Sequence, residues 1–107
     1  MAEYRFTPKA QRDLDEVFEY TLTNWGLPQA MRYTDLIAAA CADLAEAPHQ
    51  AQGCASIRPG YRRRGVEQHV IYFRPTGYGI AVTRILHQRM DAARHLRSTR
   101  IQAGDRG

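Results

Sequence analysis

The first part of the chain carries apolar side chains at helical spacing. Glu3–Phe6 alternates polar and aromatic residues, which predicts a short, half-buried strand. From Thr7 to Trp25 the apolar positions recur every three or four residues, as along one stripe of a helix of about five turns. Thr7 is expected to cap this helix and Pro8 to occupy its first position. The stripe consists of Ala10, Leu14, Val17, Phe18, Thr21, Leu22 and Trp25.

A second helix follows with almost no connection. Gly26 can adopt the left-handed conformation that ends a helix, and Pro28 suits the first turn of the next one. Pro48 stops the second helix. Because the connection is so short, the two helices must form an antiparallel hairpin, with Trp25 expected to anchor its tip. Cys41 lies on the apolar stripe of the second helix and is expected in the core. The apolar positions of this stripe are Tyr33, Leu36, Ile37, Ala40, Cys41 and Leu44.

After Pro48 the pattern changes to β-structure. Short strands are predicted at residues 56–58, 61–64, 69–74 and 79–87, with turns at 65–68 and 75–77 and one helical turn at 91–96. This order predicts an α+β fold: a short N-terminal strand, an antiparallel helical hairpin packed on an antiparallel β-sheet, and a short C-terminal helical turn. A single domain is expected over residues 1–96, with residues 97–107 as a flexible tail.

Arg84 is the most unusual residue of the predicted sheet. Strand alternation would place it on one face with Val82 and Leu86, where burial of a charge is costly unless the charge is paired or lines a cleft. Two interpretations follow from the residues alone. Arg84 is either a functional residue or a structural one that pairs with Asp43 or Glu46.

Charge is distributed unevenly along the 107 residues, whose formal net charge is +4. The first 53 residues carry four basic and eight acidic side chains, whereas residues 54–107 carry eleven arginines and three acids. Arginine presents a planar fork of donors that suits phosphates and carboxylates. The second half is therefore suited to an anionic partner, or else forms a solvated basic face.

The composition is that of an ordinary globular protein, with 44% apolar and 24% charged residues. No apolar run approaches the length of a membrane helix, and the N-terminus does not resemble a signal peptide. We therefore expect a cytoplasmic protein whose two cysteines remain free thiols. Neither the histidines nor the cysteines have zinc-ligand spacing, so no metal or cofactor is expected. His87 could act as a general acid or base on a phosphodiester, or could only form hydrogen bonds.

Several segments together resemble the ParE branch of the RelE/ParE toxin superfamily. They are RPGYRR at 58–63, HVIYFR at 69–74, and the stretch from residue 80 through RILHQRMD at 84–91 to RHL at 94–96. The opening YRFTPKA at 4–10, Asp13-Leu14 and Trp25-Gly26 fit the same family. The resemblance covers about residues 3–96, and the stretch at 84–91 is its most specific part.

This resemblance implies a toxin from a type II toxin–antitoxin system. ParE-like members are associated with poisoning of DNA gyrase, whereas RelE-like members cleave mRNA on the ribosome without a metal. Arg84 is similar in position to a strand arginine of both branches, but no tyrosine follows it and His87 is only a loose match. The departure favours a non-catalytic gyrase inhibitor, or a toxin whose target has diverged. The alternatives are an mRNA interferase using Arg84 and His87, and a non-toxic module that acts only in an antitoxin complex.

The resemblance also implies a cognate ParD-like antitoxin, which would suit this basic chain if it is acidic and folds on binding. We expect its apolar helix to lie against the helical hairpin and its acidic residues to contact Arg62, Arg64, Arg74 and Arg89. The contact with the target is expected at Arg84, His87, Arg89, Met90, Arg94 and Leu96. This segment combines cations with Met90 and Leu96, both expected to be exposed. DNA would be contacted only through the antitoxin or the target, and no membrane contact is expected.

Overall fold

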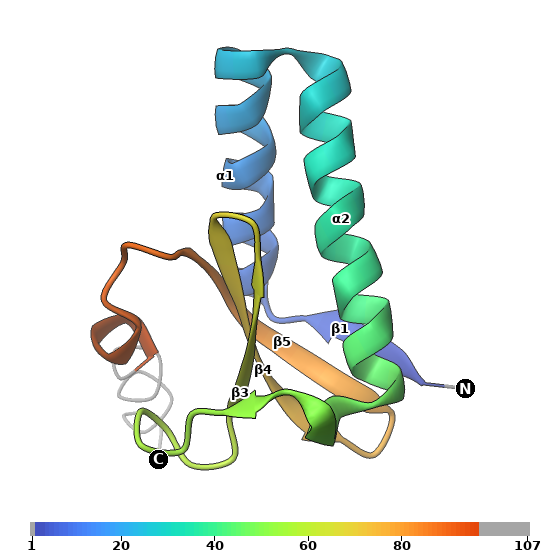
Figure 1. Ribbon diagram of the computed structural model, residues 1–107, viewed down its shortest axis with the longest axis vertical. Helices are drawn as coiled ribbons and strands as arrows, with labels where there is room; N and C mark the ends of the chain where they lie inside the picture. The colour runs from blue at the N-terminus through green and yellow to red at the C-terminus, as the bar shows by residue number, and fades with distance from the viewer. Residues whose placement is uncertain (1, 97–107) are drawn as a thin grey trace.

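A computed structural model describes residues 2–96 of the chain. Over these residues a helical hairpin covers one face of a five-stranded sheet (Figure 1). The helices are α1 (Pro8–Trp25) and α2 (Leu27–Glu46), followed by the short 3₁₀ element η1 (Pro48–Gln50) and, near the end, a helical turn at 92–96. The strands are β1 (Glu3–Phe6), β2 (Gln52–Gly53), β3 (Arg62–Val66), β4 (His69–Thr76) and β5 (Gly79–His87), in the spatial order β1-β5-β4-β3-β2. The predicted α+β fold is confirmed, and the predicted tail at 97–107 lies outside the described residues.

The predicted helix boundaries are confirmed by their capping contacts. The Thr7 hydroxyl accepts a hydrogen bond from the Ala10 backbone N–H at 3.1 Å, and Pro8 is the first helical residue. At the other end Gly26 has φ +94°, and its N–H donates to the Leu22 carbonyl at 3.0 Å. Neither α1 nor α2, the two long helices of residues 2–96, is long and apolar enough to cross a membrane.

The strand predicted at 56–58 is wrong. The backbone N–H groups of Ile57 and Arg58 both donate to the Cys54 carbonyl, at 2.9 and 3.1 Å, so this segment forms turns. Cys54 in turn donates its N–H to the Tyr61 carbonyl at 2.9 Å, which closes the loop. On the side of β3 away from β4, the neighbouring strand is the two-residue β2.

Strands β3 and β4 both extend further than predicted. β3 continues to Val66, which leaves only Glu67 and Gln68 as the turn, and Glu67 takes φ +53°. β4 includes Pro75, which cannot donate a backbone hydrogen bond. The β3 pairing ends at Phe73, so within residues 2–96 no strand pairs with β4 on that side at Pro75. Proline is tolerated there as it is in an edge strand.

The sheet is mixed, which differs from the antiparallel sheet that the sequence predicts. β1 pairs in parallel with β5, in the register Glu3↔Gly79 to Phe6↔Val82. Parallel neighbours require a long crossover connection, and the helical hairpin together with β2–β4 supplies it. β1 thus forms one edge of the sheet, beside the start of α1.

Two hydrophobic cores lie on opposite faces of the sheet. The main core packs the inner sides of α1 and α2 against Ile71, Phe73, Ile80 and Val82. The second core lies on the far face and consists of Cys54, Tyr61, Tyr72, Leu86 and Leu96. Along β4, Ile71 and Phe73 face the main core whereas Tyr72 faces the second core, as the alternation of a strand requires.

Candidate functional site

A cleft of about 850 Å³ opens beside α1, between the β3–β4 turn and the segment that follows β5. Three of the residues expected to contact the target line it, namely Arg84, His87 and Met90. Across the cleft lie two aromatic residues of α1, Tyr20 and Trp25. His69, Glu16 and Asp13 also line it, and the sequence does not identify them as site residues.

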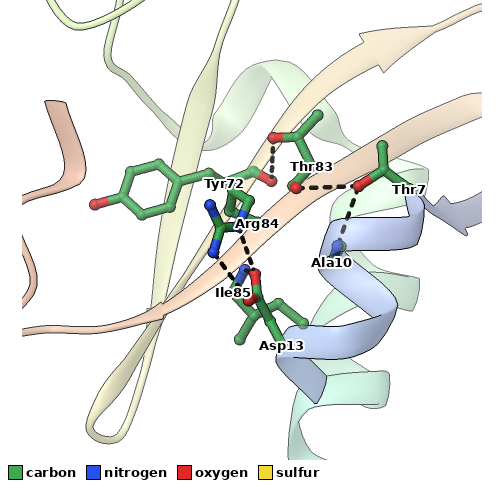
Figure 2. Close-up of polar contacts among 7 residues, drawn as sticks. All are labelled: Thr7, Ala10, Asp13, Tyr72, Thr83, Arg84 and Ile85. Atoms are coloured by element: carbon green, nitrogen blue, oxygen red, sulfur yellow. Dashed lines mark hydrogen bonds and ion pairs between the residues drawn. The ribbon is translucent and has the colours of Figure 1, made fainter. Parts of the chain in front are cut away.

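Arg84 forms a two-point ion pair with Asp13 of α1 (Figure 2). Its Nε donates to Asp13 Oδ2 at 2.7 Å and one terminal nitrogen donates to Oδ1 at 3.0 Å. Asp13 Oδ2 also accepts the Ile85 backbone N–H at 2.9 Å. Both side chains are largely buried, at 15% and 11% exposure. Arg84 is therefore paired within the fold, and its partner is Asp13 rather than Asp43 or Glu46.

This ion pair lies where β1 stops covering the edge of β5. β1 pairs with β5 only as far as Val82. Beyond that point, residues at the start of α1 form hydrogen bonds with the backbone of β5. Thr7 donates its hydroxyl to the Thr83 carbonyl at 3.0 Å, and Asp13 accepts the Ile85 backbone N–H (Figure 2). Residues of α1 therefore replace a neighbouring strand.

The face predicted for Arg84 is wrong because β5 is irregular. The β4–β5 register shifts between Tyr72 and Phe73, as at a β-bulge. The shift falls between Val82 and Arg84 on β5, so Val82 lies in the main core and Leu86, beyond the shift, lies in the second core on the opposite face. Arg84 consequently does not share one face with both residues, and its charge is held by Asp13 beside α1.

Two histidines meet in the cleft, at the ends of β4 and β5. The rings of His69 and His87 lie 5.3 Å apart between centroids, nearly perpendicular to each other. His69 Nδ1 is 2.7 Å from the Tyr33 hydroxyl, and His87 Nδ1 accepts the Arg89 backbone N–H at 3.1 Å. Burial lowers the pKa of His69, and the nearby His87 lowers it further, whereas Asp13 opposes the shift. His69 is therefore neutral at neutral pH.

Protonation of His69 should weaken the folded state. An unfolded histidine titrates near 6.5. Between that pH and the lower pKa of the folded protein the unfolded chain binds more protons, so the free energy of unfolding falls as the pH falls. The free energy of unfolding, measured by chemical denaturation at about pH 7.5 and about pH 5.5, should decline less for His69→Gln than for wild type. The difference between the two declines should be smaller than the contribution of one full proton. His49→Gln, at an exposed side chain, serves as the control. An unchanged decline in His69→Gln would contradict this account.

The arginines expected to bind the antitoxin do not form one patch. Arg62 and Arg64 lie opposite Phe73 and Ile71 across the β3–β4 pair, and therefore on the helix side of the sheet. Arg74, next to Phe73 along β4, is exposed on the other side. Arg62 is also engaged within the fold, because it donates to the His49 and Ala51 carbonyls at 3.3 and 2.7 Å. Arg89 is exposed in the turn after β5.

Two expectations about exposed and buried apolar residues are wrong. Leu96, expected to be exposed for the target, is fully buried in the second core beneath the loop that contains Cys54 and Tyr61. Trp25, expected to anchor the hairpin tip, is 72% exposed. Met90 is exposed as predicted, and so is Arg94.

Both cysteines are buried free thiols. Burial raises the pKa of Cys41 to about 12, and it also raises the pKa of Cys54. Neither side chain is a thiolate at neutral pH, so neither is suited to nucleophilic catalysis. Cys41 lies in the main core, as predicted. Within residues 2–96 no three histidine, cysteine or acidic side chains are placed to hold a metal ion.

Comparisons with known proteins agree with the resemblance. A family model described as the ParE toxin of the type II toxin–antitoxin system parDE matches residues 4–92. The chain is 40% identical over 96 residues to Toxin ParE1 of Mycobacterium tuberculosis, covering 89% of this chain and 98% of that protein. It is 36% identical over 96 residues to Toxin ParE1 of Caulobacter vibrioides, covering 90% and 99%.

The fold is similar to that of a solved structure of the chromosomal ParDE TA system from P. aeruginosa. The TM-score is 0.70 at 27% sequence identity, over 81% of this chain and 96% of that chain. The family match, residues 4–92, spans α1, α2 and strands β2–β5 and all of β1 except its first residue. The chain therefore belongs to the ParE toxin family of type II toxin–antitoxin systems.

Proposed function

We propose that this toxin arrests bacterial growth by binding and inhibiting DNA gyrase, without catalysing a reaction itself. The observation that carries the proposal is the engagement of Arg84 by Asp13 through two hydrogen bonds. A nuclease would need a strand arginine at this position free to clamp a phosphate, whereas here its fork is bound to a carboxylate. We further propose that the target is contacted in and next to the cleft, by the half-buried His87 and by the exposed Arg89, Met90 and Arg94. A DNA gyrase target implies that the toxin acts in the cytoplasm.

Cleavage of mRNA is the second candidate function, and the contact between His69 and His87 is the observation that favours it. Two adjacent imidazoles could supply a general acid and a general base. The same cleft, however, is lined by Asp13, Glu16 and Glu67. Arg84 is the arginine in the lining, and it is bound to Asp13. A polyanion would be repelled by such a surface, so we rank this function second.

A supercoiling assay with purified bacterial DNA gyrase tests the proposal. We expect the toxin to abolish the supercoiling of relaxed plasmid when present in excess over gyrase. Cells that express the toxin alone should stop growing and induce the DNA-damage response, with intact transcripts. Normal supercoiling at high toxin excess would overturn the proposal. Transcript cleavage in the same cells would then identify an mRNA interferase, and harmless expression would identify a module that acts only with its antitoxin.

We also propose that an acidic antitoxin, encoded beside the toxin gene, neutralises this protein. Arg64, Arg74 and Arg89 are exposed and remain its proposed contacts, together with Arg62. Arg64 and Arg74 lie on opposite faces of the sheet. A segment that reaches both must pass around the sheet edge, which an initially disordered chain can do as it folds on binding.

A further inference from the structure

The apolar stripe of α1 continues beyond the part that the fold covers. Val17 and Thr21 are buried, at 7% and 8% exposure. Leu22 and Trp25 lie further along the same stripe but are 40% and 72% exposed. A stripe with this period is suited to packing against another element. Within residues 2–96 the sheet does not extend far enough to cover the last turn of α1. Figure 1 shows both helices continuing past the strands.

The start of α2 adds apolar side chains to the same end of the hairpin. Leu27 and Met31 are 51% and 53% exposed, just across the Gly26 connection from Trp25. Of the seven large apolar side chains exposed in residues 2–96, five belong to this region, so they are concentrated rather than scattered. Concentrated apolar exposure marks interaction sites, and Trp, Tyr and Met are typical of their centres. We call this surface the hairpin tip: Tyr20, Leu22, Trp25, Leu27 and Met31.

The charges around the hairpin tip restrict its partner. From residue 13 to residue 31 the chain contains four acids and no lysine, arginine or histidine, and Arg32, next to Met31, is paired with Glu67 at 3.5 Å. Arg84 neutralises Asp13, whereas Asp15, Glu16 and Glu19 are exposed. Nucleic acid and an acidic antitoxin would both be repelled by this surface. A second copy would bring the same acids face to face. The surface fits a protein that combines apolar groups with lysine or arginine.

We propose that the hairpin tip docks into an apolar recess bordered by basic residues on the protein that this toxin inhibits. The inference rests on the proposed function, because it requires a target protein distinct from the antitoxin. The tip is also continuous with the proposed target contact, since Tyr20 and Trp25 line the same cleft as His87 and Met90. Trp25 is the anchor of this contact, and the arginines of the sheet remain available to the antitoxin.

The double substitution Trp25→Ala/Met31→Ala tests the contact directly. Both side chains are more than half exposed, so the melting temperature should change little. We expect the toxin concentration for half-inhibition of gyrase supercoiling to rise at least tenfold, because truncated aromatic anchors lose about that much affinity or more. Affinity for the antitoxin encoded beside the gene should stay within about twofold, the scatter expected for residues outside an interface. Leu36→Ala, an exposed apolar residue of α2 outside the tip, should leave both measurements unchanged.

Charge reversal tests the chemistry of the partner with a second variant. Glu16→Lys/Glu19→Lys should weaken gyrase inhibition, with the largest loss at low salt, because basic groups on the target would then be repelled. In contrast, Arg64→Glu/Arg74→Glu should weaken binding of the antitoxin. If Glu16→Lys/Glu19→Lys instead strengthens inhibition, the target surface is acidic and the proposed partner chemistry is wrong.

The outcomes separate this inference from the proposed function. If wild type inhibits gyrase and Trp25→Ala/Met31→Ala inhibits it equally, the tip is not the contact while the proposed function stands. If that variant loses antitoxin binding as well, the tip belongs to the antitoxin and the inference is overturned. If wild type does not inhibit gyrase, the proposed function fails, and growth arrest becomes the readout for the tip. If the variant no longer arrests growth but keeps its antitoxin affinity, the tip docks on another protein. If the variant still arrests growth, or if wild type does not arrest it, the inference is overturned.

Discussion

Replacement of Asp13 by alanine is expected to lower the free energy of unfolding by about 3 kcal/mol, because it leaves a largely buried guanidinium without its partner. Arg84 is 15% exposed and donates two hydrogen bonds to Asp13. The same substitution removes the acceptor of the Ile85 N–H, at an edge of β5 that β1 does not reach. Urea denaturation followed by circular dichroism measures the loss.

Two further variants separate charge from hydrogen bonding at this position. Asp13→Asn keeps an oxygen for the Ile85 N–H but removes the charge, so its loss should be smaller than that of Asp13→Ala. Asp15→Ala, at an exposed neighbour, should cost no more than about 0.5 kcal/mol. If Asp13→Ala proves as stable as Asp15→Ala, the ion pair does not hold α1 to β5.

The helical hairpin could be predicted because its signals are local. Thr7 and Pro8 set the start of α1, and Gly26 ends it within a few residues of the next helix. The predicted bounds of β5, residues 79–87, also agree with the structure, because this segment is rich in apolar and β-branched residues. In each case the residues that determine the element are its own or its immediate neighbours, so no tertiary contact is needed to identify it.

The candidate site depends on contacts that no local pattern contains. Asp13 and Arg84 lie 71 residues apart in sequence, and nothing around either residue identifies the other. Contact between His69 and His87 follows from the β4–β5 register, which a turn at Gly77 and Tyr78 and a shift near Tyr72 determine together. With the turn placed at 75–77 and no bulge, the predicted register could not bring the two histidines together.

Burial is hard to predict where it depends on the length of one element relative to another. Leu96 is buried because the loop of Cys54 and Tyr61 reaches across the far face of the sheet. Trp25 is exposed because α1 is longer than the sheet that covers its inner side. The helical period correctly assigns Trp25 to the apolar stripe, but a period does not say how far along the stripe the covering layer extends.

Gly79→Ala is expected to lower the free energy of unfolding by about 2–5 kcal/mol, by combining backbone strain with overpacking. Gly79 has φ +143°, which side-chain-bearing residues rarely adopt. It pairs with Glu3 in the parallel β1–β5 register, and a Cβ added there would overlap the Glu3 carbonyl oxygen and lie 2.8 Å from the Glu3 nitrogen. These obstacles are backbone atoms, which cannot rotate away as a flexible side chain could.

The strain should be relieved by release of β1 from the sheet edge. Tyr4 and Phe6 would then lose their packing against the main core, so amide hydrogen exchange should accelerate across β1 before it does in β4. Gly77→Ala is the matched control, because a Cβ at Gly77 meets no atom within 4 Å, and its cost should stay within about 0.5 kcal/mol. Equal unfolding midpoints for the two variants would mean that β1 does not hold this register. If only Gly79→Ala lowers the free energy of unfolding, the close approach of the Gly79 and Glu3 backbones is what holds β1 at the edge of the sheet, beside the start of α1.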